Sequence, residues 1–312
     1  MTRGSLLSTG MLSAALILTA CGENNADNTG NENNVNENEA NNMNNDIDVD
    51  GDEVSGEDEI EIGLNNWAEN VAVANMWGVL LEEEGYDVEL TMSEKAPIWE
   101  AVATDGIDLS LEVWLPTTDE PFYEDHGDDV YLSDEIWFEG TGLGLAVPEY
   151  VDIDSMDELN DNVDMFDGEI VGIDAGASLT RLTDEAIETY DLEYEQLVSS
   201  ESSMLSALDQ AYSNEEPVLV TMWNPHWAFS EYDIKYLDDP ENAFGEAEDI
   251  HYKAREDFPE VYPEVKEWLD NWMMDDENLG DLMSYIENSD DEREGAEDWI
   301  EDNRDLIDEW ME

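Results

Sequence analysis

Basic residues are scarce in this chain of 312 residues. Nine lysines and arginines stand against 85 aspartates and glutamates, and the formal net charge is −76. Nucleic acids and anionic lipid head groups are bound through basic patches, so this balance argues against both as partners. Cys21 is the single cysteine, which excludes an intramolecular disulfide framework. Histidines are also few, and His126 and His251 lack metal-ligand spacing, so no metal site is expected.

Apolar residues, in contrast, are plentiful. Hydrophobic residues make up 41% of the sequence, and 11 of its residues are tryptophan. Chains that stay disordered lack this material, so a folded core is predicted. The charge would destabilise a compact state by self-repulsion unless salt screened it, and at molar salt the Debye length is only about 3 Å. The composition therefore indicates the solvated surface of a halophilic protein.

The N-terminus has the features of an export signal. Arg3 precedes the apolar stretch 11–20, which is shorter than the roughly 20 residues of a membrane span but suits a signal peptide. The stretch ends in LTAC, which resembles the lipobox of bacterial lipoproteins. That resemblance implies that residues 1–20 are removed and that Cys21 is lipidated. We therefore expect an extracytoplasmic protein that a lipid anchors to the cell membrane, with no transmembrane helix.

An acidic, asparagine-rich segment follows and is predicted to be a flexible linker over residues 21–59. Within it, the stretch from Asp46 to Glu57 matches the calcium-loop pattern D-x-[DN]-x-[DN]-G-x5-E. No amphipathic helix precedes it, and Glu53 occupies a position that is normally apolar in such loops. Whether this loop binds calcium is left open, and no metal ligand is assigned.

Residues 60–312 alternate between strand and helix patterns. Strands are predicted at 60–65, 87–92, 107–115, 141–148, 169–175, 194–200 and 217–223, and helices at 68–84, 97–106, 178–190 (with Ser178 as N-cap) and 201–212. Three acidic amphipathic helices are expected around 265–272, 279–286 and 299–311. Because the pattern restarts near residue 150, the fold class is α/β with two lobes and largely parallel sheets. Lobe I is assigned to 60–148 and 250–312, and lobe II to 149–249.

Three tryptophans lie where predicted strands end: Trp67, Trp114 and Trp223. Ligands of open α/β sheets bind beyond the carboxyl ends of the strands, so these indoles are candidate binding residues. A quaternary ammonium group has no N–H to donate, but each indole face attracts it by ~0.5 to ~2 kcal/mol. Three such indoles predict an aromatic cage for a quaternary ammonium ligand.

A candidate site for the opposite charge follows a strand of the second lobe. Residues 174–179, DAGASL, lead into a helix whose first backbone N–H groups favour an anion. This turn and Trp223 belong to the second lobe, whereas Trp67 and Trp114 belong to the first. A zwitterionic ligand would then be held from both sides.

Four phrases together carry a family resemblance: NNWAENVAVANMW, LEVWLPTTD, VGIDAGASLTRLT and TMWNPHWAFSEYDIKYLDDP. They resemble the substrate-binding lipoproteins of ABC importers for glycine betaine and related compatible solutes, over essentially residues 60–312. The resemblance implies a type II periplasmic-binding-protein fold with a hinge and an interlobe cleft. It also implies a monomeric solute-binding protein with no catalytic activity and no cofactor, which delivers its ligand to a membrane permease.

The resemblance further implies roles for individual residues. Trp67, Trp114 and Trp223 would enclose the trimethylammonium group, and the backbone amides of Ser178 and Leu179 would hold the carboxylate.

One position departs from the family pattern. Family members carry a carboxylate-binding histidine five residues after the second cage tryptophan, and this chain has Asp119 there. An ionised aspartate donates no hydrogen bond and repels a carboxylate. Either Asp119 points away and another donor such as His226 or Arg181 replaces it, or the ligand lacks a carboxylate, as choline does.

Other ligands and classes stay open from the sequence. Betaine, proline betaine, carnitine and choline are not distinguished, and neither is the envelope type. A surface carbohydrate-binding protein would also use tryptophans, but it would need many side-chain hydrogen bonds. A glycosidase would need two carboxyl groups roughly 5 to 9 Å apart, which a chain this acidic can provide by chance.

Overall fold

The computed structural model describes residues 58–312. The predicted signal peptide, Cys21 and the calcium-loop pattern from Asp46 to Glu57 lie outside these residues. Within 58–312 no helix has the length and apolar character needed to cross a membrane. The same stretch contains no group of three or more histidine, cysteine, aspartate or glutamate residues placed to hold a metal ion.

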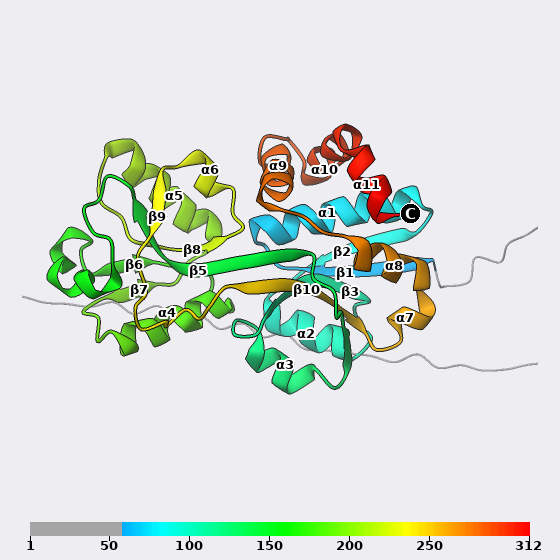
Figure 1. The fold of residues 1–312 in the computed structure, drawn as a ribbon, viewed down its shortest axis with the longest axis horizontal. Helices are drawn as coiled ribbons and strands as arrows, with labels where there is room; N and C mark the ends of the chain where they lie inside the picture. Colours follow the sequence, from blue (N-terminus) through cyan, green and yellow to red (C-terminus); the bar gives the residue numbers. More distant parts are fainter. Residues whose placement is uncertain (1–57) are drawn as a thin grey trace, which may run out of the picture. The chain divides into compact units, whose positions relative to one another are not determined.

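The first lobe is built on a sheet in which β2, β1 and β3 run parallel, in that order. Its strands are β1 (Glu59–Leu64), β2 (Asp87–Met92), β3 (Leu109–Leu115), β4 (Val130–Leu132) and β10 (Glu248–Arg255). The helices that connect them are α1 (Ala68–Glu83), α2 (Lys95–Ala103) and α3 (Glu120–His126). β10 pairs antiparallel with β3 and β4. The parallel strands therefore all end at one edge of the sheet, facing the second lobe (Figure 1).

The second lobe has a smaller sheet in which β6 pairs parallel with both β7 and β8. Its strands are β6 (Glu169–Val171), β7 (Glu195–Leu197), β8 (Val220–Asn224) and β9 (Ile234–Tyr236). Its helices are α4 (Ser178–Thr189), α5 (Glu201–Asn214) and α6 (Ala228–Glu231), with short 3₁₀ turns at Met156–Asp161 and Val163–Met165.

One long strand belongs to both sheets. β5 (Phe138–Pro148) pairs antiparallel with β10 through its first residues and with β8 from Gly142 to Ala146. Figure 1 shows it running from one lobe into the other. The chain returns through the segment between β9 and β10, residues 237–247. Two stretches of backbone, β5 and the segment 237–247, thus connect the lobes, whereas the chain between β5 and β6 lies within the second lobe.

The remaining helices cover the first lobe. They are α7 (Phe258–Val261), α8 (Pro263–Asn271), α9 (Asp276–Glu287), α10 (Glu292–Asp302) and α11 (Arg304–Trp310). α9 and α10 pack against α1, which is buried on most of its surface. Trp272 stacks on Trp137 with ring centroids 4.4 Å apart and meets Trp77 edge to face at 5.5 Å. These apolar contacts belong to a large core that extends through both lobes, and a smaller, separate cluster includes Ile98, Trp99 and Val113.

The two-lobed α/β architecture is confirmed, and the structure corrects three details. The sheets are parallel only in part, because β5 and β10 run antiparallel where the lobes meet. Ser178 is the first residue of α4, and Ala177 is the N-cap without a side-chain hydrogen bond. The helix expected over 299–311 is interrupted at Asn303, whose N–H bonds back to Trp299 and ends α10.

Candidate functional site

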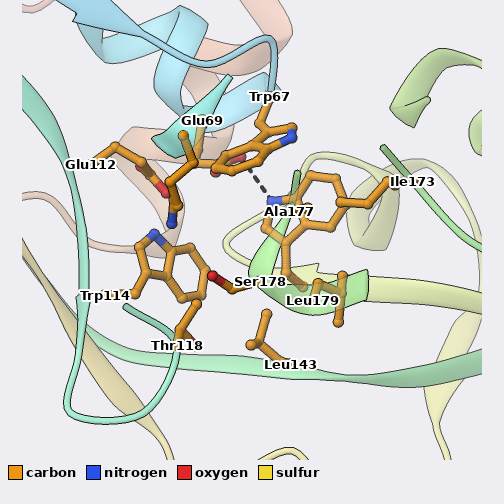
Figure 2. A pocket seen from close by; sticks show the side chains of 12 residues that line it. Trp67, Glu69, Glu112, Trp114, Thr118, Leu143, Ile173, Ala177, Ser178 and Leu179 are labelled. Atoms are coloured by element: carbon orange, nitrogen blue, oxygen red, sulfur yellow. Dashed lines mark hydrogen bonds between the residues drawn. The ribbon is translucent and has the colours of Figure 1, made fainter. Parts of the chain in front are cut away.

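The three tryptophans predicted from the sequence line a single cavity between the lobes (Figure 2). Trp67 is the N-cap residue of α1, directly after β1, Trp114 lies near the end of β3, and Trp223 lies near the end of β8. All three are at least nine-tenths buried. Trp67 leads directly into α1, and Trp114 and Trp223 are each followed within two residues by the turn that ends their strand. The carboxyl ends of strands from both lobes therefore bring the three indoles together.

Residues of both lobes form the wall of this cavity. The first lobe supplies Trp67, Glu69, Lys95, Glu112, Trp114 and Thr118, the strand β5 shared by the two sheets supplies Leu143, and the second lobe supplies Ile173, Ala177, Ser178, Leu179 and Trp223. The cavity volume is about 30 Å³, which leaves room for only a few solvent-sized groups. A solute of several carbon atoms therefore enters only when the lobes separate or wall side chains move.

Two backbone donors face this space at the start of α4. The N–H groups of Ser178 and Leu179 have no hydrogen-bond partner within residues 58–312, whereas Thr180 already bonds to the carbonyl of Ala177. Such free N–H groups at a helix N-terminus are suited to an anion. The DAGASL turn has therefore placed its donors at the same cavity as the indoles.

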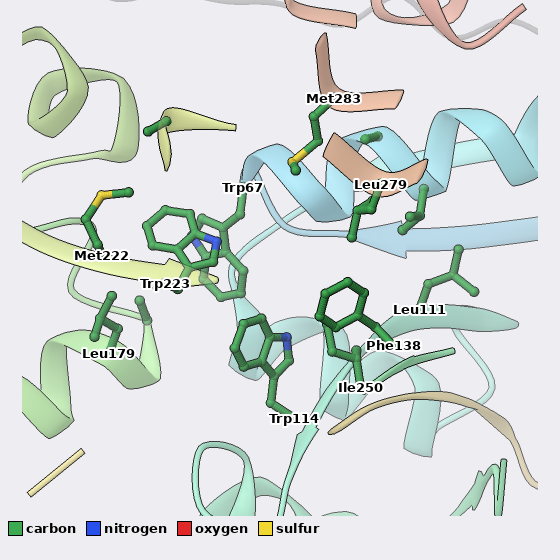
Figure 3. Close-up of a cluster of buried hydrophobic side chains, with 14 of the residues drawn as sticks. Trp67, Leu111, Trp114, Phe138, Leu179, Met222, Trp223, Ile250, Leu279 and Met283 are labelled. Carbon is green, nitrogen blue, oxygen red and sulfur yellow. The ribbon is translucent and has the colours of Figure 1, made fainter. Parts of the chain in front are cut away.

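The indole N–H groups of two cage tryptophans each bond to a carboxylate of the opposite lobe. Trp67 Nε1 donates to Asp174 Oδ2 at 3.1 Å, and Trp223 Nε1 donates to Glu69 Oε2 at 2.8 Å, the dashed bond in Figure 2. Because each ring is fixed by its N–H edge, its face is turned to the cavity, where Lys95 Nζ lies over the ring of Trp67. Figure 3 shows Trp67 beside Trp223, with Trp114 next to them, where the apolar core of both lobes meets.

Asp119 is fully buried and does not line the cavity. Its Oδ2 accepts the backbone N–H of Trp114 at 3.0 Å. Its Oδ1 accepts from Lys95 Nζ at 2.6 Å and, more weakly, from Ser178 Oγ at 3.5 Å. The aspartate that departs from the family pattern is therefore turned away from the cavity and is neutralised by a lysine.

The two donors suggested for the carboxylate lie elsewhere. His226 Nε2 faces Glu201 Oε1 at 3.1 Å, and His226 Nδ1 accepts the N–H of Ala228. Burial lowers the pKa of His226 to about 3 and raises that of Glu201 to about 8, so their contact is a neutral hydrogen bond. The Arg181 side chain is 37% exposed and pairs with Glu185 at 2.9 Å. Neither His226 nor Arg181 belongs to the cavity wall.

Sequence reasoning missed three charged residues of the wall: Lys95, Glu69 and Glu112. Burial raises the pKa of Glu69 to about 8, with a further contribution from the nearby charge of Glu201. Burial also raises the pKa of Glu112 well above its ordinary value, and its Oε2 has no partner within the described chain. The sequence did contain a signal for Glu112. Residues two apart on a strand share a face, and Glu112 is two residues before Trp114.

Comparison with known proteins identifies the family. Residues 58–302 match the family model described as the substrate-binding domain of the ABC-type glycine betaine transport system. The chain belongs to this family. The resemblance read from the four sequence phrases is thereby confirmed, and the match covers both lobes.

Individual members of the glycine betaine family are similar to this chain in sequence and structure. A glycine betaine/carnitine transport binding protein, GbuC, of Listeria monocytogenes is 37% identical over 146 residues, which is 46% of this chain and 49% of the relative. The match thus spans about half the length of that curated relative.

Solved structures are similar over a longer stretch. The glycine betaine, L-proline-binding protein ProX of Borrelia burgdorferi is 34% identical with a TM-score of 0.77, over 81% of this chain and 96% of that one. Lactococcal OpuAC, in a closed conformation complexed with glycine betaine, is 28% identical with a TM-score of 0.76, over 81% and 99%. These similarities confirm the expected type II periplasmic-binding-protein fold.

Proposed function

We propose that this protein is a solute-binding protein that captures glycine betaine or a related quaternary ammonium osmoprotectant and delivers it to the permease of an ABC importer. It breaks no bond and acts without a cofactor. The observation that carries this proposal is the enclosed interlobe cavity, in which three indoles and the two free amides of Ser178 and Leu179 converge. The family membership, and the glycine betaine complexed with lactococcal OpuAC, support the same reading.

The chemistry of the wall fits the two ends of such a ligand. A trimethylammonium group is large, weakly hydrated and without N–H donors, so aromatic faces in a dry site bind it better than hydrogen-bond acceptors. A carboxylate needs donors, which the first turn of α4 offers. A surface carbohydrate-binding protein would instead need many polar side chains, and the second lobe supplies mainly apolar ones.

We propose that the ligand binds as the lobes close. β5 and the segment 237–247 would bend as the hinge, with residues 60–148 and 250–312 on one side and 149–249 on the other. The closed form would present the surface that the permease recognises. In this proposal the protein is extracytoplasmic and monomeric, and the lipidated Cys21 anchors it to the membrane.

Choline is the second candidate ligand, and a specific observation favours it. Glu112 lines the cavity with an Oε2 atom that has no partner within the described residues, and a carboxyl oxygen can accept the hydrogen bond of the choline hydroxyl. Carnitine, which has both charges, is a variant of the first candidate.

Isothermal titration in molar KCl tests the proposal. The protein without its signal peptide is titrated with glycine betaine, choline and carnitine, and then as Trp67→Ala, Trp114→Ala and Trp223→Ala variants. Each variant should bind at least about tenfold more weakly, because it loses a cation–π face and its apolar contact. Trp268→Ala is the matched control, since Trp268 is half-buried on α8 outside the cavity. Wild-type affinity in all three cage variants would refute the site, and binding of sugars alone would refute the function.

A further inference from the structure

The cavity wall contains one basic residue, Lys95, and it raises a question about charge. Glu69 and Glu112 line the same small space, and Asp119 lies just behind it. Burial raises the pKa of both glutamates and so favours their neutral forms, and the same desolvation disfavours a ligand that carries a carboxylate. Without a fixed cation, such a ligand would be disfavoured relative to a simple cation.

Lys95 is placed to supply that cation. It is the first residue of α2, its side chain is 3% exposed, and Asp119 Oδ1 holds its Nζ at 2.6 Å. Asp119 in turn contacts Ser178 Oγ at 3.5 Å, so the lysine ammonium and the start of α4 approach the same carboxylate. Nζ also lies over the face of the Trp67 ring, 5.0 Å from its centroid.

The donors at this corner are not all in use. An ammonium group has three N–H donors, and within residues 58–312 Lys95 uses one, toward Asp119. The amides of Ser178 and Leu179 are also free in that stretch. Two more residues of the wall carry unpaired atoms: within the described chain, Trp114 Nε1 and Glu112 Oε2 have no partner although both side chains are at least nine-tenths buried. Buried polar atoms left in this state indicate a place that a polar ligand completes.

We propose that Lys95 determines specificity by binding the carboxylate of a betaine-type ligand, together with the amides of Ser178 and Leu179. Asp119 is the positioning residue that holds the ammonium at the cavity edge and balances its charge. Lys95 on α2 and Asp119 in the turn before α3 thus together replace the single carboxylate-binding donor that the family pattern has at position 119. This inference rests on the proposed function and names the part of the site that selects zwitterions over simple cations.

The geometry of a betaine is compatible with this assignment. Its quaternary nitrogen and its carboxyl carbon are separated by one methylene group, so a carboxylate bound at Lys95 keeps the nitrogen beside the indoles. The positive charges of the ligand and of Lys95 are compensated, because the ligand carboxylate and Asp119 would lie on either side of the lysine ammonium. Choline has a hydroxyl in place of the carboxylate and gains little from Lys95.

The test is the ratio of affinities for glycine betaine and choline, measured by titration calorimetry in molar KCl on wild type and Lys95→Met. Methionine keeps a long apolar side chain without charge. The single Lys95→Met variant leaves Asp119 buried and unpaired, so the Lys95→Met/Asp119→Asn double variant is measured as well. Asparagine at position 119 can still accept the backbone N–H of Trp114. The matched control is Lys266→Met/Asp270→Asn, which removes another lysine–aspartate pair, on α8 away from the cavity.

The proposal predicts that the betaine-to-choline affinity ratio falls at least about tenfold in both Lys95 variants, and that it stays at the wild-type value in the Lys266 control. An equal loss for both ligands would overturn it, because Lys95 would then act only on folding or closure. Tighter binding of both would also overturn it, by showing that the ammonium occupies the cation position. If wild type binds neither compound, the proposed function itself fails, and this specificity role fails with it.

Discussion

Replacing Glu69 by glutamine should change the pH dependence of stability in a defined way. Glu69 is 1% exposed, and burial together with Glu201 raises its pKa from an ordinary 4.5 to about 8. In the unfolded chain this carboxyl loses its proton near pH 4.5, while in the folded protein it keeps the proton until about pH 8. Between these values the folded state binds one more proton, so the free energy of unfolding falls as the pH rises.

The magnitude follows from the linkage relation. One proton of difference changes the free energy of unfolding by about 1.4 kcal/mol per pH unit. From pH 5.5 to 7.5, wild type should therefore lose about 3 kcal/mol relative to Glu69→Gln. Glutamine has no proton to lose, and its side-chain oxygen can still accept the Trp223 N–H, so the variant removes the titration and retains the cross-lobe bond.

The assay is urea unfolding in molar KCl, followed by tryptophan fluorescence at several pH values. Only the difference between variant and wild type is interpreted, which cancels the titration of Lys253 and His226, whose lowered pKa values act in the opposite direction. Glu100→Gln is the control, because Glu100 is exposed on α2 and its substitution measures the effect of losing one surface charge. Parallel stability curves for wild type and Glu69→Gln would show that Glu69 is ionised in the folded protein and would refute the reasoning.

Three further changes test other parts of the site and fold. Trp67→Phe should weaken ligand binding by about two- to tenfold, less than Trp67→Ala, because phenylalanine keeps a ring face but loses the bond to Asp174; equal titration results for the two variants would contradict this. Glu112→Gln should bind like wild type, because burial raises the pKa of that carboxyl well above its ordinary value and so favours the neutral form that glutamine imitates; weaker binding of choline alone would mean that the carboxyl is ionised. Gly295→Ala should lower the free energy of unfolding by about 1 to 3 kcal/mol, because its Cβ would lie 2.7 Å from Ile286 Cα, and a melting temperature equal to wild type would refute that clash.

Local patterns in the sequence were sufficient for much of the fold. The boundaries of β2 agree with the alternating stretch 87–92, and α1 ends within one residue of its prediction. Residues 87–92 alternate apolar and polar side chains as a strand does, and α1 is a long, largely apolar run without proline that is buried on most of its surface. The three tryptophans could be placed together for a related reason, since the carboxyl ends of parallel strands are a topological feature that follows from the order of strands and helices.

β10 was not predicted, and the reason is physical. Its sequence, EDIHYKAR, alternates apolar Ile250, Tyr252 and Ala254 with polar residues, but the pattern is short and mostly charged, and two of its charged residues, Glu248 and Lys253, are buried. Lys253 is accommodated by Ser110 and the carbonyl of Glu112, and Glu248 by the backbone and hydroxyl groups of Thr118. These partners are distant in sequence, and only the folded sheet brings them to the strand. Lys95 was missed for the same reason, because its significance depends on Asp119, 24 residues away.

The contacts of the cage tryptophans connect recognition with closure. Trp67 of the first lobe bonds to Asp174 of the second, and Trp223 of the second bonds to Glu69 of the first. Each ring therefore offers its face to the cavity while its N–H edge links the lobes, and neither contact can form fully when the lobes are apart. A ligand that packs against these faces stabilises the same side-chain positions that the cross-lobe bonds require, so its binding favours the closed state over the open one. No separate latch is then needed, and variants that remove an N–H should weaken binding even where the ligand touches only the ring.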